Sequence, residues 1–464
     1  MKSQRLLFAA PTAYLLSGLA AWLDYVIPGL RERGWDVTLG LVSGPRHHRP
    51  EEYLKVHPES QVIRIHCETG TRQGRVSAVR SALREVAADL VVSVNIPDAI
   101  LAVAEERCAG CHSTRGAVAC HGIQADLFSD MRLLGDDLDG VICVNRLAVK
   151  LSQVLGTVDE DRCQYAACGT VVPPADEALS RVAGRGVTAA RPLTIAWCGR
   201  IEQEQKRIFD VLEIARQLDQ EGVEFRLKIA GGGPDENSLR RAIADAELEH
   251  RFEWMGVLPS AALPDRLYRA ADVFLLTSRW ETGPIVVWEA MANGCPVVSS
   301  RYVGSGQEGA LRNENNCLMF DIGHIEGAAK QLRRLAESID LAKRLSSNAW
   351  TLVSTRYSID SSVNAWDGAL REILSAPARD PHVRNSVSTT ASGRLDRWLP
   401  PAVAEGLRSY LGRRAPDSGP GGEWPHTLGQ CPWDEAEFWE IAERLDLPGS
   451  RPHEMLAGPG SATC

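Results

Sequence analysis

Residues 272–300 read DVFLLTSRWETGPIVVWEAMANGCPVVSS, and this stretch decides the fold. The apolar runs at its two ends have the length of buried strands, and a loop and a short helix fit between them. Pro284 suits the first helical position, Gly294 suits a left-handed C-terminal cap, and Pro296 prevents the helix from continuing. The stretch therefore predicts one βαβ unit of a parallel sheet.

The same alternation of short apolar strands and amphipathic helices extends over about 370 residues, which predicts an α/β protein with Rossmann-like, doubly wound parallel sheets. The strand candidates are RLLFAA, DVTLGLV, QVIRI, LVVSVN, GAVACH and DGVICV in the first half, and LTIAWCG, FRLKIAG, RFEWMG, DVFLLTS and CPVVSS in the second. We expect an N-terminal domain over 1–172, a linker without apolar periodicity over 173–190, a second domain over 191–355, a last helical segment over 356–375 and a Pro- and Trp-rich extension over 376–464.

Composition and charge are those of a soluble protein and argue against a nucleic-acid-binding protein. The 464 residues are 44% hydrophobic and 24% charged, which is the balance of an ordinary soluble protein. The net charge of −9 leaves no basic excess to neutralise phosphates, so we expect no nucleic-acid partner. The twelve cysteines fall mostly inside apolar runs such as GVICV and IAWCG, which favours reduced thiols in the cytoplasm.

The start of the chain resembles a signal peptide only superficially. Pro11 interrupts the apolar run LLFAAPTAYLLSGLAA, and apolar residues at helical spacing then continue into GLRERGW. We therefore interpret residues 5–42 as a strand, a helix and a second strand. Because no uninterrupted apolar run of about 18 residues occurs elsewhere, we expect no membrane-spanning helix.

Two glutamates flank the predicted helix start in the first stretch. Glu281 precedes the helix and Glu289 lies inside it, and the helix N-terminus between them attracts phosphate through its N–H groups and its dipole. A nucleotide sugar offers the matching order of sugar hydroxyls, diphosphate and ribose hydroxyls, and carboxylates are strong acceptors for hydroxyl donors. The alternative is a glutamate favoured by the helix dipole and a second one facing solvent.

Two further motifs follow predicted strands. Gly199-Arg200 comes directly after LTIAWC, with Lys206 downstream, and cations at the carboxyl end of a strand can neutralise a diphosphate. LKIAGGGPDE runs into a turn whose Gly232 and Gly233 would let the backbone approach a ligand. An ordinary surface charge cluster and a plain turn are the alternatives.

Taken together and in order, these motifs resemble the donor domain of the retaining, group 1 (family 4) glycosyltransferases of the GT-B fold. The resemblance covers residues 191–355 and includes the run EAMANGCPVV. It implies two Rossmann-like domains that face each other across a cleft, with the segment 356–375 as a helix that crosses back to the first domain. The implied activity is transfer of a sugar from a nucleotide-diphosphate sugar to a sugar, lipid-linked or small-molecule acceptor, without a cofactor.

The resemblance also assigns roles to residues. Arg200 and Lys206 would hold the donor diphosphate, Glu281 would bind the transferred sugar and Glu289 would take the ribose. The remaining donor-binding positions would be backbone positions, namely Gly18, Gly199, Gly232, Gly233, Gly283, Pro284 and Ile285. The family usually has a bulky apolar residue and a glycine after the first glutamate, so Thr282-Gly283-Pro284 departs from the pattern at the position that bears on sugar identity.

The N-terminal half matches the family only as a pattern. Gly18 stands in the first strand-to-helix loop, where relatives often have a glycine pair, and His121 after GAVAC occupies the place of the family's cleft histidine. A purely structural histidine is the alternative. Asp137-Leu138-Asp139 precedes a strand and Asp159-Glu160-Asp161 lies in a polar loop, so neither D-x-D pattern suits a metal and we expect none.

Two rival functions share the expected fold. A nucleotide-sugar epimerase would turn over donor without an acceptor, and a non-catalytic nucleotide-sugar-binding protein should have lost Arg200, Lys206 or Glu281. The extension is expected to lie outside the part of the chain that does the chemistry. Its apolar residues around 398–411 are expected to pack on the protein, and the alternatives are pairing of subunits or contact with the inner face of a membrane.

Overall fold

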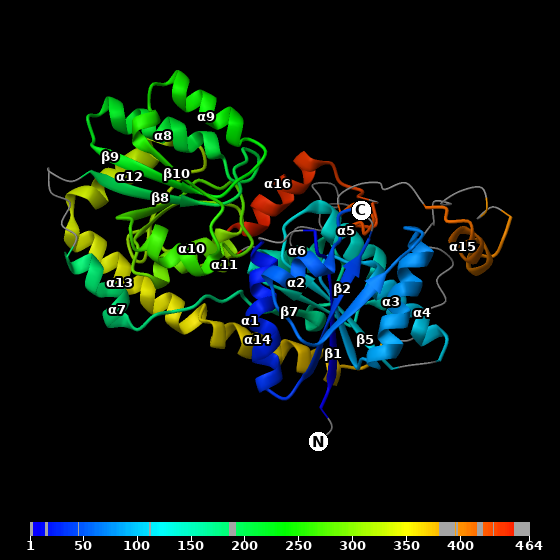
Figure 1. The fold of residues 1–464 in the computed structure, drawn as a ribbon. Helices are drawn as coiled ribbons and strands as arrows, with labels where there is room; N and C mark the ends of the chain where they lie inside the picture. Colours follow the sequence, from blue (N-terminus) through cyan, green and yellow to red (C-terminus); the bar gives the residue numbers. More distant parts are fainter. Residues whose placement is uncertain are drawn as a thin grey trace, which may run out of the picture. The chain divides into compact units, whose positions relative to one another are not determined.

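A computed structural model describes residues 3–13, 17–44, 46–110, 113–184, 192–379, 395, 398–414, 421–429 and 431–449. The chain divides into two compact units. Unit 1 comprises 1–166, 363–441 and 451–464, and unit 2 comprises 167–362 and 442–450. The fold is the predicted α/β architecture, because each unit contains one all-parallel sheet with helices on its faces (Figure 1).

Unit 1 contains a seven-stranded sheet in the order β3-β2-β1-β4-β5-β6-β7. All six strand predictions for this half are confirmed, whereas the short β7 was missed because it has three half-buried residues and no apolar run. The strands are β1 Arg5–Ala10, β2 Asp36–Ser43, β3 Val62–His66, β4 Leu90–Ser93, β5 Arg115–Cys120, β6 Gly140–Cys143 and β7 Cys163–Tyr165.

Helices cover both faces of this sheet. Successive strand residues point to opposite faces, so Leu7 and Ala9 join the core under α3 and α4, whereas Phe8 packs edge-on against Trp22 of α1. Figure 1 shows α14 beside α1, and Trp22 contacts Trp366 of α14. The helices are α1 Gly18–Glu32, α2 Pro50–Val56, α3 Arg72–Val86, α4 Asp98–Cys108, α5 Ala125–Leu134 and α6 Arg146–Val154, and α14 Ile359–Ser375 enters unit 1 at residue 363.

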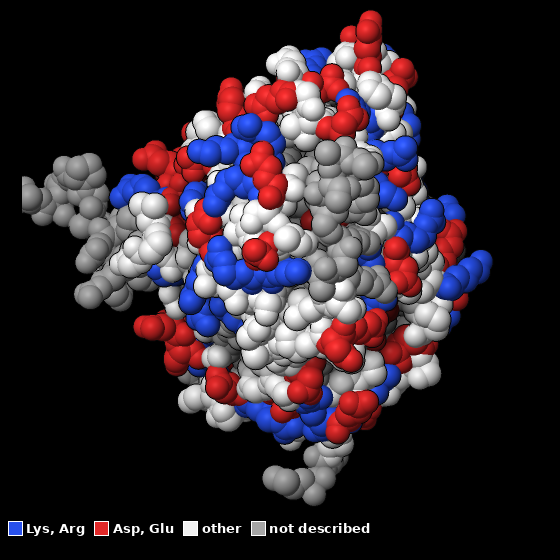
Figure 2. All heavy atoms as spheres, turned by 90° about the vertical axis from the view of Figure 1, so that its left-hand side faces the viewer, with Lys and Arg blue, Asp and Glu red and all other residues white. Residues whose placement is uncertain are grey.

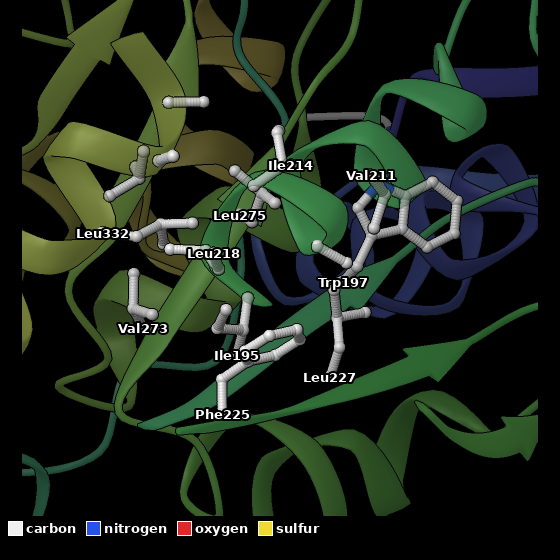
Figure 3. Close-up of a cluster of buried hydrophobic side chains, with 14 of the residues drawn as sticks. Ile195, Trp197, Val211, Ile214, Leu218, Phe225, Leu227, Val273, Leu275 and Leu332 are labelled. Carbon is white, nitrogen blue, oxygen red and sulfur yellow. The ribbon is translucent and has the colours of Figure 1, made fainter. Parts of the chain in front are cut away.

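Unit 2 contains a six-stranded sheet in the order β10-β9-β8-β11-β12-β13. One face packs on α8, α9 and α12 around a fully buried apolar cluster that includes Ile195, Trp197 and Leu275 (Figure 3). The strands are β8 Leu193–Cys198, β9 Phe225–Ala230, β10 Phe252–Gly256, β11 Val273–Leu276, β12 Val297–Ser300 and β13 Leu318–Phe320. The helices are α7 Ala175–Gly184, α8 Ile208–Gln220, α9 Glu236–Asp245, α10 Ile285–Ala292, α11 Ser305–Glu308, α12 Ile325–Glu337 and α13 Ile339–Arg356.

The segment 173–190 is not a plain linker. Helix α7 forms within it and packs against α13, and the Trp350 indole donates a hydrogen bond to the Pro173 carbonyl. The residues 185–191 lie outside the described part of the chain.

The extension forms the two helices that its sequence indicates, α15 Pro401–Tyr410 and α16 Glu435–Asp446. Trp424 is fully buried in the core of unit 1 among residues of β1, β2 and α3, and its indole donates to the Ser43 carbonyl at 3.0 Å. The extension over 376–464 forms no unit of its own, because the part up to 441 belongs to unit 1 and 442–450 to unit 2. The expected packing is seen for Trp424 but not for Trp398 and Tyr410, which are 85% and 88% exposed.

The surface carries charges of both signs. On the face drawn in Figure 2, blue and red side chains are interspersed among the described residues rather than gathered into a patch of one sign. Among the described helices, none is long and apolar enough to cross a membrane.

Candidate functional site

The candidate donor site lies where the strand order of unit 2 reverses. Strands β8 and β11 are neighbours in the sheet, and the chain leaves them towards opposite sides. Open parallel sheets bind ligands at the carboxyl ends of such strands. Gly199 and Arg200 follow β8 and the loop with Glu281 follows β11, so the fold places these predicted residues at one edge of the sheet.

Lys206 and Glu281 form the centre of this site. The Lys206 ammonium donates to Glu281 Oε1 at 2.6 Å, and the two side chains are only 16% and 6% exposed. The Ser278 hydroxyl donates to the same oxygen at 2.5 Å, and Gln205 Nε2 donates to Oε2 at 3.5 Å. Thr277 donates to the Lys206 carbonyl at 2.7 Å, which fixes the lysine loop to the end of β11. The structure thus brings together two predicted residues that are 75 positions apart in sequence.

Arg200 lies at the rim. Its side chain is 65% exposed, and its Nε donates to Glu202 at 2.7 Å. Glu202 itself is buried, and sequence reasoning missed it because a glutamate two positions after an arginine carries no signal. The arginine is therefore held by a neighbouring carboxylate.

Glu289 has a buried partner that the sequence did not indicate. Tyr268 donates its hydroxyl to Glu289 Oε2 at 2.6 Å from the π-helical turn Pro264–Tyr268. Burial raises the pKa of Glu289 to about 7, and the Tyr268 hydrogen bond opposes that rise. Burial, with a contribution from the charge of Glu289, also raises the pKa of the Cys198 thiol to about 12. Glu289 is therefore partly protonated near neutral pH, and the Cys198 thiol stays protonated there.

The glycine turn after β9 packs against the loop after β8. A Cβ on Gly231, whose φ is +137°, would lie 1.9 Å from the Gly199 carbonyl oxygen. A Cβ on Gly233 would lie 2.3 Å from the Ile201 carbonyl oxygen, and one on Gly232 would meet Val257 at 3.2 Å. Close packing of two loops therefore explains why glycine is required at positions 231 and 233. Approach of a donor to Gly232 and Gly233 stays a prediction.

The helix after Glu281 begins one residue later than expected. Helix α10 starts at Ile285, and Pro284 is the N-cap residue whose carbonyl accepts from Val287 N at 2.8 Å. Gly294 has the predicted left-handed conformation, with φ +71°, at the other end. The start of a helix offers N–H groups that have no partner within the helix, which makes the segment from Gly283 to Ile285 suited to an anion.

In unit 1, His121 directly follows β5 and lies against two tryptophan rings. Its ring is 4.5 Å from Trp22 and stacks on Trp366 at 6.1 Å, measured between centroids. Burial lowers the pKa of His121 to about 4, so its imidazole is neutral at pH 7. Gly18 is the first residue of α1, and the Ser17 side chain caps the helix by accepting from Ala20 N.

The acidic patterns considered for metals have other partners. Asp139 is fully buried and forms ion pairs with Arg107 and Arg115, and Asp159 accepts from Arg379 at 2.6 Å. Within the described ranges, no group of three or more His, Cys, Asp or Glu side chains is arranged to hold a metal. Among the ten described cysteines, none is joined in a disulfide.

Two Rossmann-like units, with this site at the switch point of the second, define the GT-B class of glycosyltransferase folds. Residues 187–351 match the family described as glycosyl transferases group 1. The match covers the candidate donor site, from Arg200 to Glu289. The predicted resemblance to group 1 glycosyltransferases of the GT-B fold is therefore confirmed. The narrower assignment to family 4 stays a prediction.

Relatives and solved structures agree with this class. The chain is 40% identical over 133 residues to WcaL of Escherichia coli K12, described as a colanic acid biosynthesis glycosyltransferase, across 27% of this chain and 32% of that one. It is 38% identical over 120 residues to the amylovoran biosynthesis glycosyltransferase AmsK of Erwinia amylovora, across 25% and 29% of the two chains. The chain thus matches about a third of the length of these relatives.

Among solved structures, the lipopolysaccharide outer core galactosyltransferase WaaB superposes with a TM-score of 0.60, covering 79% of this chain and 99% of that one at 16% identity. Anabaena HepE in complex with UDP and glucose superposes with a TM-score of 0.63, with the same coverages and identity. These likenesses show the fold.

Proposed function

We propose that the chain transfers a sugar from a nucleotide-diphosphate sugar, held in unit 2, to a hydroxyl group of an acceptor. The observation that carries this proposal is the buried Lys206–Glu281 pair at the switch point, followed along the chain by the start of α10 and by Glu289. A cation, an anion-binding helix start and two carboxylates match a diphosphate between two sets of hydroxyls. The relatives named above, all described as glycosyltransferases, support the class of reaction.

Each residue then has a task. Lys206 and Arg200 stabilise the charge of the departing diphosphate, because preorganised cations stabilise negative charge that develops in the transition state. Arg200 must exchange Glu202 for phosphate, and its 65% exposed side chain leaves room to turn. Glu281 accepts hydroxyls of the transferred sugar, and Glu289 accepts those of the ribose once its carboxyl is ionised.

We further propose that the anomeric configuration is retained and that no metal is required. The leaving diphosphate can accept the proton of the acceptor on the same face of the sugar, so Glu281 and Glu289 need not act as the acid and base of a hydrolase. In unit 1, the neutral His121 imidazole would hydrogen-bond a sugar hydroxyl or carbonyl rather than supply a proton, because its pKa is about 4.

Helix α15 suggests where a lipid-linked acceptor would be found. The helix faces unit 1 with polar groups, since the Glu405 carboxylate accepts from the hydroxyls of Thr69 and Thr71. Its opposite side exposes apolar and aromatic side chains, followed by two exposed arginines: Trp398, Val403, Leu407, Tyr410, Leu411, Arg413 and Arg414. We propose that this side contacts an anionic bilayer surface, where aromatic and cationic side chains are favourable. Full-length protein should sediment with phosphatidylglycerol vesicles, and Trp398→Ser with Tyr410→Ser should abolish that sedimentation.

A thermal-shift panel tests the proposed donor. UDP-glucose, GDP-mannose and ADP-glucose are each compared with the protein alone, and binding of one donor at a hundredfold excess over its Kd stabilises the protein by about 2.7 kcal/mol. Lys206→Ala should remove the shift. A panel without any shift contradicts the proposal, and turnover of a donor without an acceptor favours the epimerase.

A further inference from the structure

The last turn of α16 docks on unit 2 through a carboxylate. Asp446 Oδ2 accepts from Gly304 N at 2.8 Å and from Gly306 N at 3.1 Å, and Oδ1 accepts from Gln307 N at 2.8 Å. Gln307 Nε2 donates to the Leu447 carbonyl at 2.6 Å. The contact is intimate, because a Cβ on Gly306 would lie 2.1 Å from the Asp446 carbonyl oxygen.

The loop that Asp446 holds is paired with the loop that carries Glu281. Val303 N donates to the Arg279 carbonyl at 2.8 Å, and Glu281 N donates to the Val303 carbonyl at 3.1 Å. These two hydrogen bonds form a parallel bridge between Trp280 and Val303. The backbone of Glu281 therefore takes its position from the segment 303–307.

The same segment is anchored at its far end by the core of unit 2. The buried Glu308 carboxylate accepts from Arg356 and from the Tyr357 hydroxyl, each at 2.6 Å. The Tyr357 ring stacks on Trp288 of α10 at 4.1 Å with an interplanar angle of 10°. Two carboxylates thus hold the segment, Asp446 at its start and Glu308 at its end. Asp446 belongs to helix α16, which lies outside the matched family region 187–351.

We propose that Asp446 is a positioning residue for Glu281, so that the C-terminal extension completes the donor site. The inference rests on the proposed function. A charged carboxylate on three backbone N–H groups makes strong hydrogen bonds, and its loss leaves those groups without their partner. The start of the segment then relaxes, and the bridge transmits that movement to Glu281. A misplacement of about 1 Å at a reacting centre costs on the order of 10²-fold in rate.

The test separates sugar recognition from nucleotide recognition. Only the sugar of the donor requires Glu281, whereas a nucleoside diphosphate is bound by the other groups of the site. In Asp446→Ala and Asp446→Asn, the affinity for UDP, GDP or ADP should stay within about threefold of that of the unchanged protein. The affinity that the sugar of the matching nucleotide sugar adds to that of the nucleotide should fall by about tenfold or more, and so should kcat. Gly306→Ala, which displaces the α16 backbone, should reproduce this pattern. Glu443→Ala, at an exposed position of the same helix, is the matched control and should change neither.

The possible results distinguish a positioning role of Asp446 from a merely structural one. Equal losses for the nucleotide and the nucleotide sugar would show a merely structural role and overturn the inference, as would unchanged kinetics in all three variants. If Asp446→Ala does not fold, Asp446→Asn decides, because it preserves the shape of the side chain. If the unchanged protein binds neither nucleotides nor nucleotide sugars, the proposed function itself fails.

Discussion

Replacing Lys206 with methionine should destabilise unit 2 and abolish transfer for two separable reasons. The substitution leaves the Glu281 carboxylate buried without its cation, and removing one partner of a buried ion pair costs about 3–5 kcal/mol. Lys206 is 16% exposed and Glu281 keeps Ser278 and Gln205 as donors, so we expect a loss at or just below the lower limit of that range, about 2–3 kcal/mol. For a unit of this size, that lowers Tm by about 4–12 °C.

The double variant Lys206→Met with Glu281→Gln separates stability from activity. A neutral pair removes the unpaired charge, and replacing both members of a buried pair by uncharged groups is often neutral for stability. Melting curves at pH 7.5 should therefore place the double variant within about 1 kcal/mol of the unchanged protein, while both variants stay at least about 10²-fold below it in kcat/KM. A double variant that melts no higher than Lys206→Met, or a Lys206→Met that melts like the unchanged protein, would refute the assignment of a buried pair.

Three further predictions concern the same site. Arg200→Ala should lower kcat/KM by about 10²-fold or more, and unchanged steady-state kinetics would remove Arg200 from the diphosphate site. Excess EDTA should leave transfer intact, and a loss that Mn²⁺ or Mg²⁺ restores would count against metal independence. The pKa of Glu289 is raised to about 7 in the folded state, so ionisation of this carboxyl destabilises the fold increasingly as the pH rises from about 4.5 through 7. Glu289→Gln, which cannot ionise, should therefore raise Tm at pH 8 but not at pH 4. Donor affinity should strengthen as the pH rises through about 7 in the unchanged protein and lose that dependence in Glu289→Gln, as titration calorimetry would measure.

Much of the fold was predictable because each element carries its own local signal. Strand β11 and helix α10 are bounded by an apolar run, Pro284 and Gly294, and these signals act over a few residues. Helix α7 gave a weak signal because a neighbour in the tertiary structure, α13, stabilises it. Strand β13 was missed for a similar reason, since its three residues are held as a strand by pairing with β12.

The site was predictable as a set of residues but not as a set of contacts. Motif order indicated Lys206 and Glu281, yet nothing in the sequence indicated that they pair directly. Tyr268 and Glu202 escaped detection because a tyrosine in a π-helical turn and a glutamate in a loop match no spacing rule. The role proposed for Asp446 required the structure, because 139 positions separate it from Gln307.

The burial of Trp424 among strands and helices from the first hundred residues has a consequence for biosynthesis. The core of unit 1 lacks one of its largest side chains until the ribosome has passed residue 424. At about 5–20 residues per second, the nascent N-terminal sheet waits on the order of ten to fifty seconds for that side chain. During that interval its apolar face under α3 is incompletely covered, and such exposed surface is what molecular chaperones recognise. Pulse-labelled chains that stop before residue 424 should therefore be more protease-sensitive than chains released at full length.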